Sequence, residues 1–142
     1  MAELAIHGGP KAKTTPNFPM YPGGLEIGEL EKKEVCEVLD NKYLFRYYGP
    51  EGVESKVKSF ETAFAEKMGS KYCLATSSCT GALLSAMTAC GFGPGDEVIV
   101  SAYTFFASCA TIVGVRAIPV IAEVDETLTI DPDDIEREIT PS

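Results

Sequence analysis

The sequence is poor in positive charge and in histidine. Twelve Lys and Arg stand against 21 Asp and Glu, for a formal net charge of -9. The clustered bases that bind the phosphate backbone of nucleic acids are missing, so no nucleic-acid partner is expected. The single histidine, His7, lies in a Gly-rich leader and is interpreted as a surface loop residue. A His-based metal site is therefore not expected.

Long apolar runs are also missing. No segment approaches the roughly 18 consecutive apolar residues that a membrane span needs, and the N-terminus lacks a charged stretch followed by an apolar one. The cysteines are odd in number and have no CxxC spacing, which fits free thiols in a reducing compartment. We expect a cytoplasmic protein without a membrane partner. Four of the five cysteines have apolar or small neighbours and are predicted to be buried. The five are Cys36, Cys73, Cys79, Cys90 and Cys109.

The length of 142 residues and the hydrophobic content of 45% indicate one globular domain or part of one. Residues 1–26 are rich in proline and glycine and show no periodicity, which predicts an irregular arm. Residues 27–142 show the patterns of an ordered domain. The acids between Glu123 and Glu138 are interpreted mainly as a solvated surface.

Two apolar stripes at helical spacing follow the arm. The first runs from Ile27 to Leu39 and the second from Val53 to Met68, where Gly69 is expected to end the helix. Between them, the segment LFRYYGPEG contains Gly and Pro residues that break a helix. It is predicted to be a constrained loop that presents Arg46 and Tyr47.

Short apolar runs alternate with helical ones from residue 71 onward. Residues 72–76, 96–102 and 116–121 are predicted to be strands, and residues 80–90 and 104–113 are predicted to be helices. Runs that are apolar at successive positions indicate strands covered on both faces. This order predicts an α/β fold with a parallel or partly mixed sheet.

A last helix is predicted to begin after Asp131, which precedes Pro132 and two further acids. The predicted strands number three, whereas α/β domains usually build sheets of about five or six. We therefore expect the sequence to be the N-terminal part of a longer polypeptide.

The turn TSSCTGA, residues 76–82, lies between the first predicted strand and the helix after it. A helix that starts at the carboxyl end of a strand offers unpaired N-H groups to an anion. Small residues let the backbone approach a phosphate, and the hydroxyls add hydrogen bonds. Plain N-capping remains an alternative reading, and neither GxGxxG nor GxxxxGK[ST] is present.

Aromatic residues follow the next predicted strand, in YTFFAS. Phe105 is expected near the serine turn, because the carboxyl ends of neighbouring strands meet at one sheet edge, whereas Phe106 is interpreted as a core residue. Aromatic rings stack on planar heterocycles with about 0.5 to 1.5 kcal/mol beyond area burial. An anion site beside a flat ring indicates a planar phosphorylated ligand.

In four segments the sequence resembles the DegT family of pyridoxal-phosphate-dependent sugar aminotransferases, a branch of fold-type I. These are LAIHGGPKAKTTPNFPMYP, RYYGPEGVESKVKSFETAFAEKMGSKYCLATSSCTGALLSAM, GFGPGDEVIVSAYTFFAS and GVRAIPVIAEVDETLTIDPDDIEREITPS. The resemblance implies a three-layer αβα sandwich, with residues 27–142 as the N-terminal part of the large cofactor-binding domain. Residues 1–26 would be an arm that packs across a homodimer interface.

The resemblance also implies site residues. Ser78, Cys79 and Thr80 would bind the phosphate of pyridoxal 5'-phosphate, although the family often has glycine or alanine in place of Cys79. Phe105 would stack on its pyridine ring. The lysine that binds the cofactor covalently and the aspartate that pairs with the pyridine nitrogen are expected beyond Ser142. None of the nine lysines here matches that position, so the segment alone is expected to be inactive.

The implied activity is transfer of an amino group from glutamate or glutamine to a keto sugar, often nucleotide-linked, or to a cyclitol. Such reactions serve cell-surface polysaccharide or secondary-metabolite biosynthesis. Arg46 and Tyr47 are expected near the substrate entrance. Two alternatives stay open: a sugar dehydratase of the same family that uses pyridoxamine phosphate, and a non-catalytic binding or assembly module.

Overall fold

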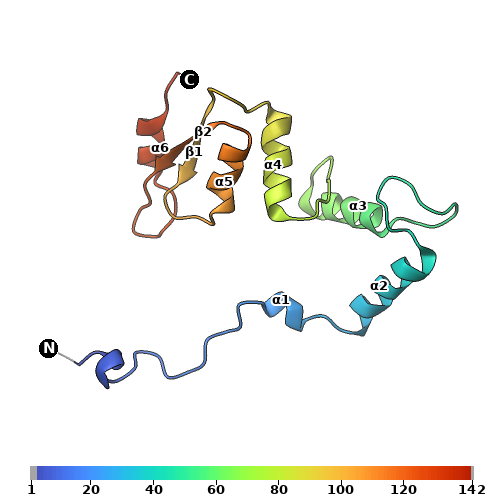
Figure 1. Cartoon of the computed structure of the whole chain (residues 1–142), viewed down its shortest axis with the longest axis horizontal. Helices are drawn as coiled ribbons and strands as arrows, with labels where there is room; N and C mark the ends of the chain where they lie inside the picture. The colour runs from blue at the N-terminus through green and yellow to red at the C-terminus, as the bar shows by residue number, and fades with distance from the viewer. Residues whose placement is uncertain (1–2, 142) are drawn as a thin grey trace. The chain divides into compact units, whose positions relative to one another are not determined.

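A computed structural model of the chain describes residues 3–141, and Figure 1 shows the order of its elements. The chain divides into two compact units, Met1–Phe60 and Glu61–Ser142. The boundary falls inside helix α3 (Lys56–Met68).

The first unit is mostly loop and helix. It contains a 3-10 turn η1 (Ala5–His7), a short helix α1 (Pro22–Leu25) and helix α2 (Glu29–Asn41). The arm, predicted to be irregular, thus carries two short helical turns. The stripe that begins at Ile27 was correctly assigned to a helix, α2.

Helix α3 also confirms its prediction and ends before Gly69, whose φ of +65° is the left-handed conformation that glycine adopts without strain. Its first turn is capped by Ser55, whose Oγ accepts the Lys58 N-H at 3.3 Å. The side chain of Lys56 forms ion pairs with Glu34 and Glu37 of α2. These contacts hold the start of α3 against α2.

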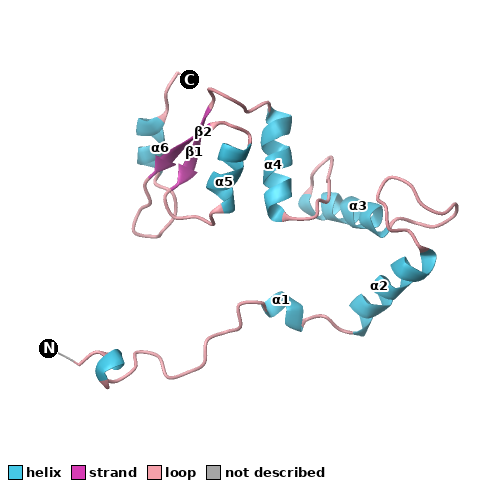
Figure 2. Cartoon of the chain, in the orientation of Figure 1, coloured by secondary structure: helices cyan, strands magenta, loops and turns pink. Residues whose placement is uncertain are grey.

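The second unit alternates helices and strands, as Figure 2 shows by colour. Its elements are α4 (Cys79–Cys90), β1 (Glu97–Ser101), α5 (Ala107–Gly114), β2 (Ile118–Ala122) and α6 (Pro132–Glu138). All five were predicted from the sequence. Helix α6 begins as expected, because Asp131 accepts the Asp133 N-H at 3.0 Å.

Strands β1 and β2 pair in parallel, with Glu97 opposite Ile118 and Ser101 opposite Ala122. Helix α5 is the crossover between them, so this part of the chain is a βαβ unit. The strands lie between α5 and α6 in Figure 1. The order helix, sheet, helix agrees with the expected αβα layering.

The core of this unit lies where α5 covers the two strands. Val100, Ile112 and Ala117 are buried together there. Helix α4 packs against α5 so closely that a Cβ at Gly114 would come within 3.0 Å of Leu84 Cδ1. This close packing holds the two helices side by side.

The prediction of a strand at residues 72–76 is wrong for this structure. The segment is extended loop without a strand partner among the described residues. Strand propensity is realised only when a neighbouring strand completes the hydrogen bonds. In the structure the Ala75 N-H bonds instead to Glu61 Oε1, at 2.8 Å.

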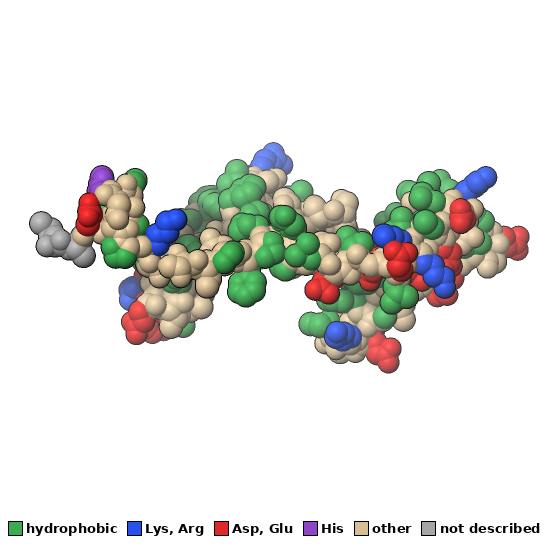
Figure 3. Space-filling model, turned by 90° about the horizontal axis from the view of Figure 1, so that it is seen from below, with side chains coloured by type: hydrophobic (Ala, Val, Ile, Leu, Met, Phe, Trp, Pro, Cys, Tyr) green, Lys and Arg blue, Asp and Glu red, His purple; other side chains and the backbone are tan. Residues whose placement is uncertain are grey.

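Two burial predictions also need correction. All five cysteines are free, as expected, but three are exposed and two half-buried, because the described elements cover little of their surfaces. Phe106 is not a core residue, because 72% of it is exposed at the start of α5. Hydrophobic side chains lie at the surface over much of the face drawn in Figure 3.

Half of the eight acids from Glu123 to Glu138 are exposed and three more are half-buried, so the expected solvated surface holds only in part. Asp134 is buried and accepts the Glu123 N-H at 2.6 Å. This bond, followed by the contact with Arg137, lowers the pKa of Asp134. Within residues 3–141, no helix combines the length and apolar character needed to cross a bilayer.

Candidate functional site

The TSSCTGA turn leads into α4 through Ser78, which is the N-cap of this helix. Ser78 has an extended backbone, and its Oγ accepts the Gly81 N-H at 3.0 Å. Thr76 Oγ1 donates to the Ser78 carbonyl at 2.9 Å and so closes the turn. Ser78 is therefore an N-cap, which was the alternative interpretation of this turn. The amides of the next two residues, Cys79 and Thr80, do not take part in this cap.

The backbone amides of Cys79 and Thr80 have no carbonyl one helical turn earlier to which they can donate. The first regular hydrogen bond of α4 runs from the Ala82 N-H to the Ser78 carbonyl, at 3.0 Å. Both residues are exposed, and the first turn contains no acid. The positive end of the α4 dipole is therefore open to an anion.

Phe105 lies between β1 and α5, with 67% of its surface exposed. Its ring centroid is 4.9 Å from that of Phe106, and the two planes are inclined by 54°. The loop before it is shaped by Ser101, whose Oγ donates to the Tyr103 carbonyl at 3.1 Å. Phe105 is thus an exposed ring at the end of a strand, as expected.

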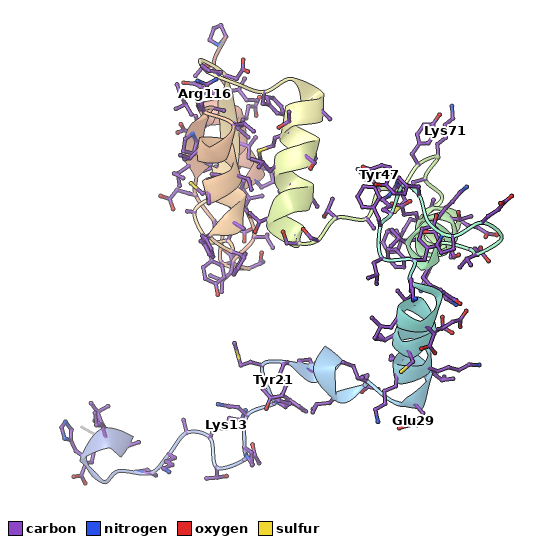
Figure 4. All side chains as sticks on the ribbon, turned by 45° about the vertical axis from the view of Figure 1, so that its right-hand side comes forward. Lys13, Tyr21, Glu29, Tyr47, Lys71 and Arg116 are labelled. Atoms are coloured by element: carbon purple, nitrogen blue, oxygen red, sulfur yellow. The ribbon has the colours of Figure 1, made fainter. Side chains whose placement is uncertain are left out.

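The N-terminal ends of α4 and α5 lie at the same end of the second unit in Figures 1 and 4. Since α4 packs along α5, Thr80 and Phe105 stand at the starts of two neighbouring helices. Neutral hydrogen-bond donors, no carboxylate in the first turn of α4 and an exposed ring suit a planar phosphorylated ligand such as pyridoxal phosphate. The role of these residues in binding it stays a prediction.

Arg46 and Tyr47 belong to the first unit, in the loop between α2 and α3. The Arg46 guanidinium lies 5.0 Å from the centroid of the Tyr47 ring, a cation-π distance. The Phe45 ring lies 4.7 Å from that of Tyr48. Tyr47 is labelled in Figure 4. The predicted loop is confirmed, and its role in substrate binding stays a prediction.

The sequence did not indicate a role for Glu61, whose side chain accepts a hydrogen bond from the main chain of residues 72–76, the segment before the turn. Only 6% of this residue is exposed. The available signal was its position, because Glu61 falls on the apolar stripe with Val57 and Phe64 at helical spacing. Among the described residues, no group of three or more His, Cys, Asp or Glu is arranged to hold a metal ion.

Solved structures share this fold. A sugar aminotransferase from Streptococcus pneumoniae in its pyridoxal phosphate form matches with a TM-score of 0.70 and 33% identity, over 81% of this chain and 28% of that one. An Escherichia coli GDP-4-keto-6-deoxy-D-mannose-3-dehydratase with bound hydrated pyridoxal phosphate matches with a TM-score of 0.69 and 29% identity, over 82% and 30%. The expected α/β class, that of fold-type I aminotransferases, is confirmed.

The sequence narrows this class to one family. The model of the DegT/DnrJ/EryC1/StrS aminotransferase family matches residues 25–142, and the chain belongs to that family. The spore coat polysaccharide biosynthesis protein SpsC of Bacillus subtilis is 46% identical over 81% of this chain and 28% of its own length. The L-glutamine:2-deoxy-scyllo-inosose aminotransferase of Micromonospora echinospora is 39% identical over 99% and 33%. The chain spans at most about a third of these relatives.

Proposed function

We propose that the intact protein is a pyridoxal-phosphate-dependent aminotransferase that moves an amino group from glutamine or glutamate to a keto sugar or cyclitol. Family membership supports the reaction type. The names of relatives support glutamine as donor and a cyclitol or polysaccharide precursor as acceptor. We further propose a cytoplasmic homodimer with residues 1–26 as its arm.

The observation that carries the proposal is the open, acid-free start of α4, together with the exposed ring of Phe105 just before the neighbouring helix α5. The amides of Cys79 and Thr80 and the Thr80 hydroxyl would bind the cofactor phosphate, and Ser78 would keep these donors in place by capping the helix. Phe105 would hold the plane of the pyridine ring. When bound, pyridoxal phosphate supplies an electron-withdrawing ring that stabilises negative charge at a substrate carbon.

Arg46 and Tyr47 would lie near the substrate entrance, where a guanidinium and a phenol can bind the hydroxyl and phosphate groups of a nucleotide-linked sugar. The lysine and aspartate of the family chemistry have no counterpart at matching positions here. We therefore propose that these 142 residues do not transaminate by themselves.

A dehydratase of the same family is a second candidate, since a 3-dehydratase is among the structural neighbours. Product analysis with the intact protein separates the two. A transaminase converts glutamine or glutamate to its keto acid in step with amino-sugar formation. A dehydratase that uses pyridoxamine phosphate also consumes the amino donor, because replacing a sugar hydroxyl by hydrogen takes two electrons from the donor's amine. It releases a deoxygenated keto sugar and ammonia and forms no amino sugar. A protein with the fold that catalyses neither reaction would be the binding module.

Cofactor binding tests the site assignment most directly. In the intact protein, Thr80→Ala and Phe105→Ala should each raise the Kd for pyridoxal phosphate about tenfold, through loss of a charged hydrogen bond and of ring stacking. The measurement is a titration followed by cofactor absorbance. Thr88→Ala removes an exposed hydroxyl from the last turn of α4 and Phe106→Ala removes the neighbouring ring, and both controls should bind like the parent. If both site variants bound the cofactor as tightly as the parent, the assignment would be wrong.

A further inference from the structure

Glu61 is a buried carboxylate that the proposed binding site does not use. It lies in α3 with 6% of its surface exposed, although Phe60 and Phe64 of the same helix are 54% and 44% exposed. Burial of a charged group is costly unless hydrogen bonds compensate for the lost water. A carboxylate in this position therefore calls for a structural or functional reason.

The partner of Glu61 points to that reason. Its Oε1 accepts the N-H of Ala75 at 2.8 Å, across 14 positions of sequence. Ala75 lies three residues before Ser78, in the segment 72–76 that has no strand partner among the described residues. The main chain that enters the phosphate turn is thus attached to α3 through a carboxylate.

Further hydrogen bonds extend this attachment to the helix start. Thr76 Oγ1 donates to the Ser78 carbonyl at 2.9 Å, and Ser78 Oγ accepts the Gly81 N-H at 3.0 Å. A displacement of Ala75 would therefore be passed to Ser78, and from there to the two amide donors that follow it. Donors that are held in place before binding need no ordering on association, which strengthens binding.

We propose that Glu61 is a positioning residue for the phosphate-binding turn, acting through the Ala75 amide. The proposal rests on the function proposed above, because it assumes that the α4 start binds the cofactor phosphate. Glu61 touches neither cofactor nor substrate. Its effect should therefore depend on the phosphate group of the ligand.

The test compares three variants of the intact protein. Glu61→Leu keeps similar volume and removes both acceptor oxygens, whereas Glu61→Gln retains one. Asp134→Leu is the matched control. Asp134, in the first turn of α6, is also buried, at 7% exposure, and its side chain also accepts a main-chain N-H, that of Glu123. The Kd is measured for pyridoxal phosphate and for pyridoxal, which lacks the phosphate.

Glu61→Leu should raise the Kd for pyridoxal phosphate about tenfold. The Kd for pyridoxal should change less than about twofold, and Glu61→Gln should restore most of the affinity. Asp134→Leu should leave both Kd values unchanged even if it lowers the melting temperature. Equal losses for both ligands, or equal losses in Glu61→Leu and Asp134→Leu, would show a general structural role and overturn the proposal.

Hydrogen exchange without cofactor gives an independent readout. The amide of Ala75 should exchange faster in Glu61→Leu than in the parent, while the amides of β1 and β2 keep their protection. Unchanged exchange at Ala75 would overturn the proposed attachment whatever the cofactor does. If the parent protein bound no pyridoxal phosphate, the proposed function would be wrong, and with it the role of Glu61 in cofactor binding. Faster exchange at Ala75 in Glu61→Leu would then support only the attachment of Ala75 to α3.

Discussion

Helix α2 begins with Glu29 and Glu31 in its first turn, whereas the first turn of α4 contains no acid. In α2, Glu31 Oε2 accepts the Gly28 N-H at 2.8 Å, which lowers the pKa of Glu31. In α4, the corresponding cap is the neutral hydroxyl of Ser78. The chain therefore supplies its own negative charge at one helix start and none at the other.

This difference is informative, because both helices have the same positive end and nearly the same length, 13 and 12 residues. In α2, carboxylates in the first turn already compensate for the positive end of the helix dipole, so a further anion would be repelled. The start of α4 can accept an anion from outside the chain. Helix α6 resembles α2, with Asp133 and Asp134 in its first turn. The comparison marks the start of α4 as better suited to a phosphate than the starts of α2 and α6, while α3 and α5 also begin without an acid.

The largest expected effect comes from making α4 resemble α2. Thr80→Asp places a negative charge where the cofactor phosphate is proposed to bind, and should weaken pyridoxal phosphate binding by about a hundredfold through charge repulsion. A cofactor titration of the intact protein measures this. Thr88→Asp, in the last turn of α4, is the control for an added charge on the same helix. An affinity for pyridoxal phosphate that survives in Thr80→Asp would contradict the proposed site.

A smaller effect is expected at the opposite ends of the two helices. Lys42 ends α2 with a φ of +59°, and Gly91 ends α4 with a φ of +87°. Lys42→Gly should stabilise the protein and Gly91→Ala should destabilise it, each by about 1 kcal/mol, since only glycine adopts this conformation without strain. Urea unfolding measures both changes. If both substitutions changed the free energy of unfolding in the same direction, this explanation of the helix ends would be wrong.

The smallest effect concerns acid pH. The pKa of Glu31 is lowered in the folded state, so its contribution to stability is present above its unfolded value, about 4.3, and is lost as the pH falls through the folded value. Ser78 does not titrate in this range. Acidification should therefore lower the protection factor of the Gly28 amide, which is its intrinsic exchange rate divided by its observed rate, and leave that of Gly81 unchanged.

The control for this prediction is Glu31→Gln, which keeps an acceptor oxygen and has no carboxylate to titrate. In this variant the exchange rate at Gly28, corrected for intrinsic chemistry, should become nearly independent of pH in the same range. Equal acid sensitivity in parent and variant would assign the effect to other carboxylates of α2, such as Glu34, whose pKa is also lowered by its contact with Lys56.

Most elements could be predicted from the sequence, because caps and apolar periodicity act over a few residues. Asp131 started α6, Gly69 ended α3, and the run that became β1 was assigned correctly. The segment 72–76 is also a short apolar run that was predicted to be a strand, yet it is loop here. A strand requires a partner elsewhere in the chain, and local composition contains no information about that partner.

The candidate site was predicted in part. Ser78 and Phe105 lie at helix and strand ends, as their sequence neighbours indicate. The burial of Glu61 and the exposure of Phe106 could not be read from spacing, since both depend on what the fold places against them. The one local sign that Glu61 would be buried was its position as a single acid on an apolar stripe.

The sequence by itself determined the longer helices from α2 onward, several of their ends and the family to which the chain belongs. Only the tertiary structure decided which predicted strands pair, which side chains are covered, and that a carboxylate of α3 holds the main chain before α4. Local signals depend on atoms a few residues apart, whereas pairing and burial depend on residues that the folded backbone brings together.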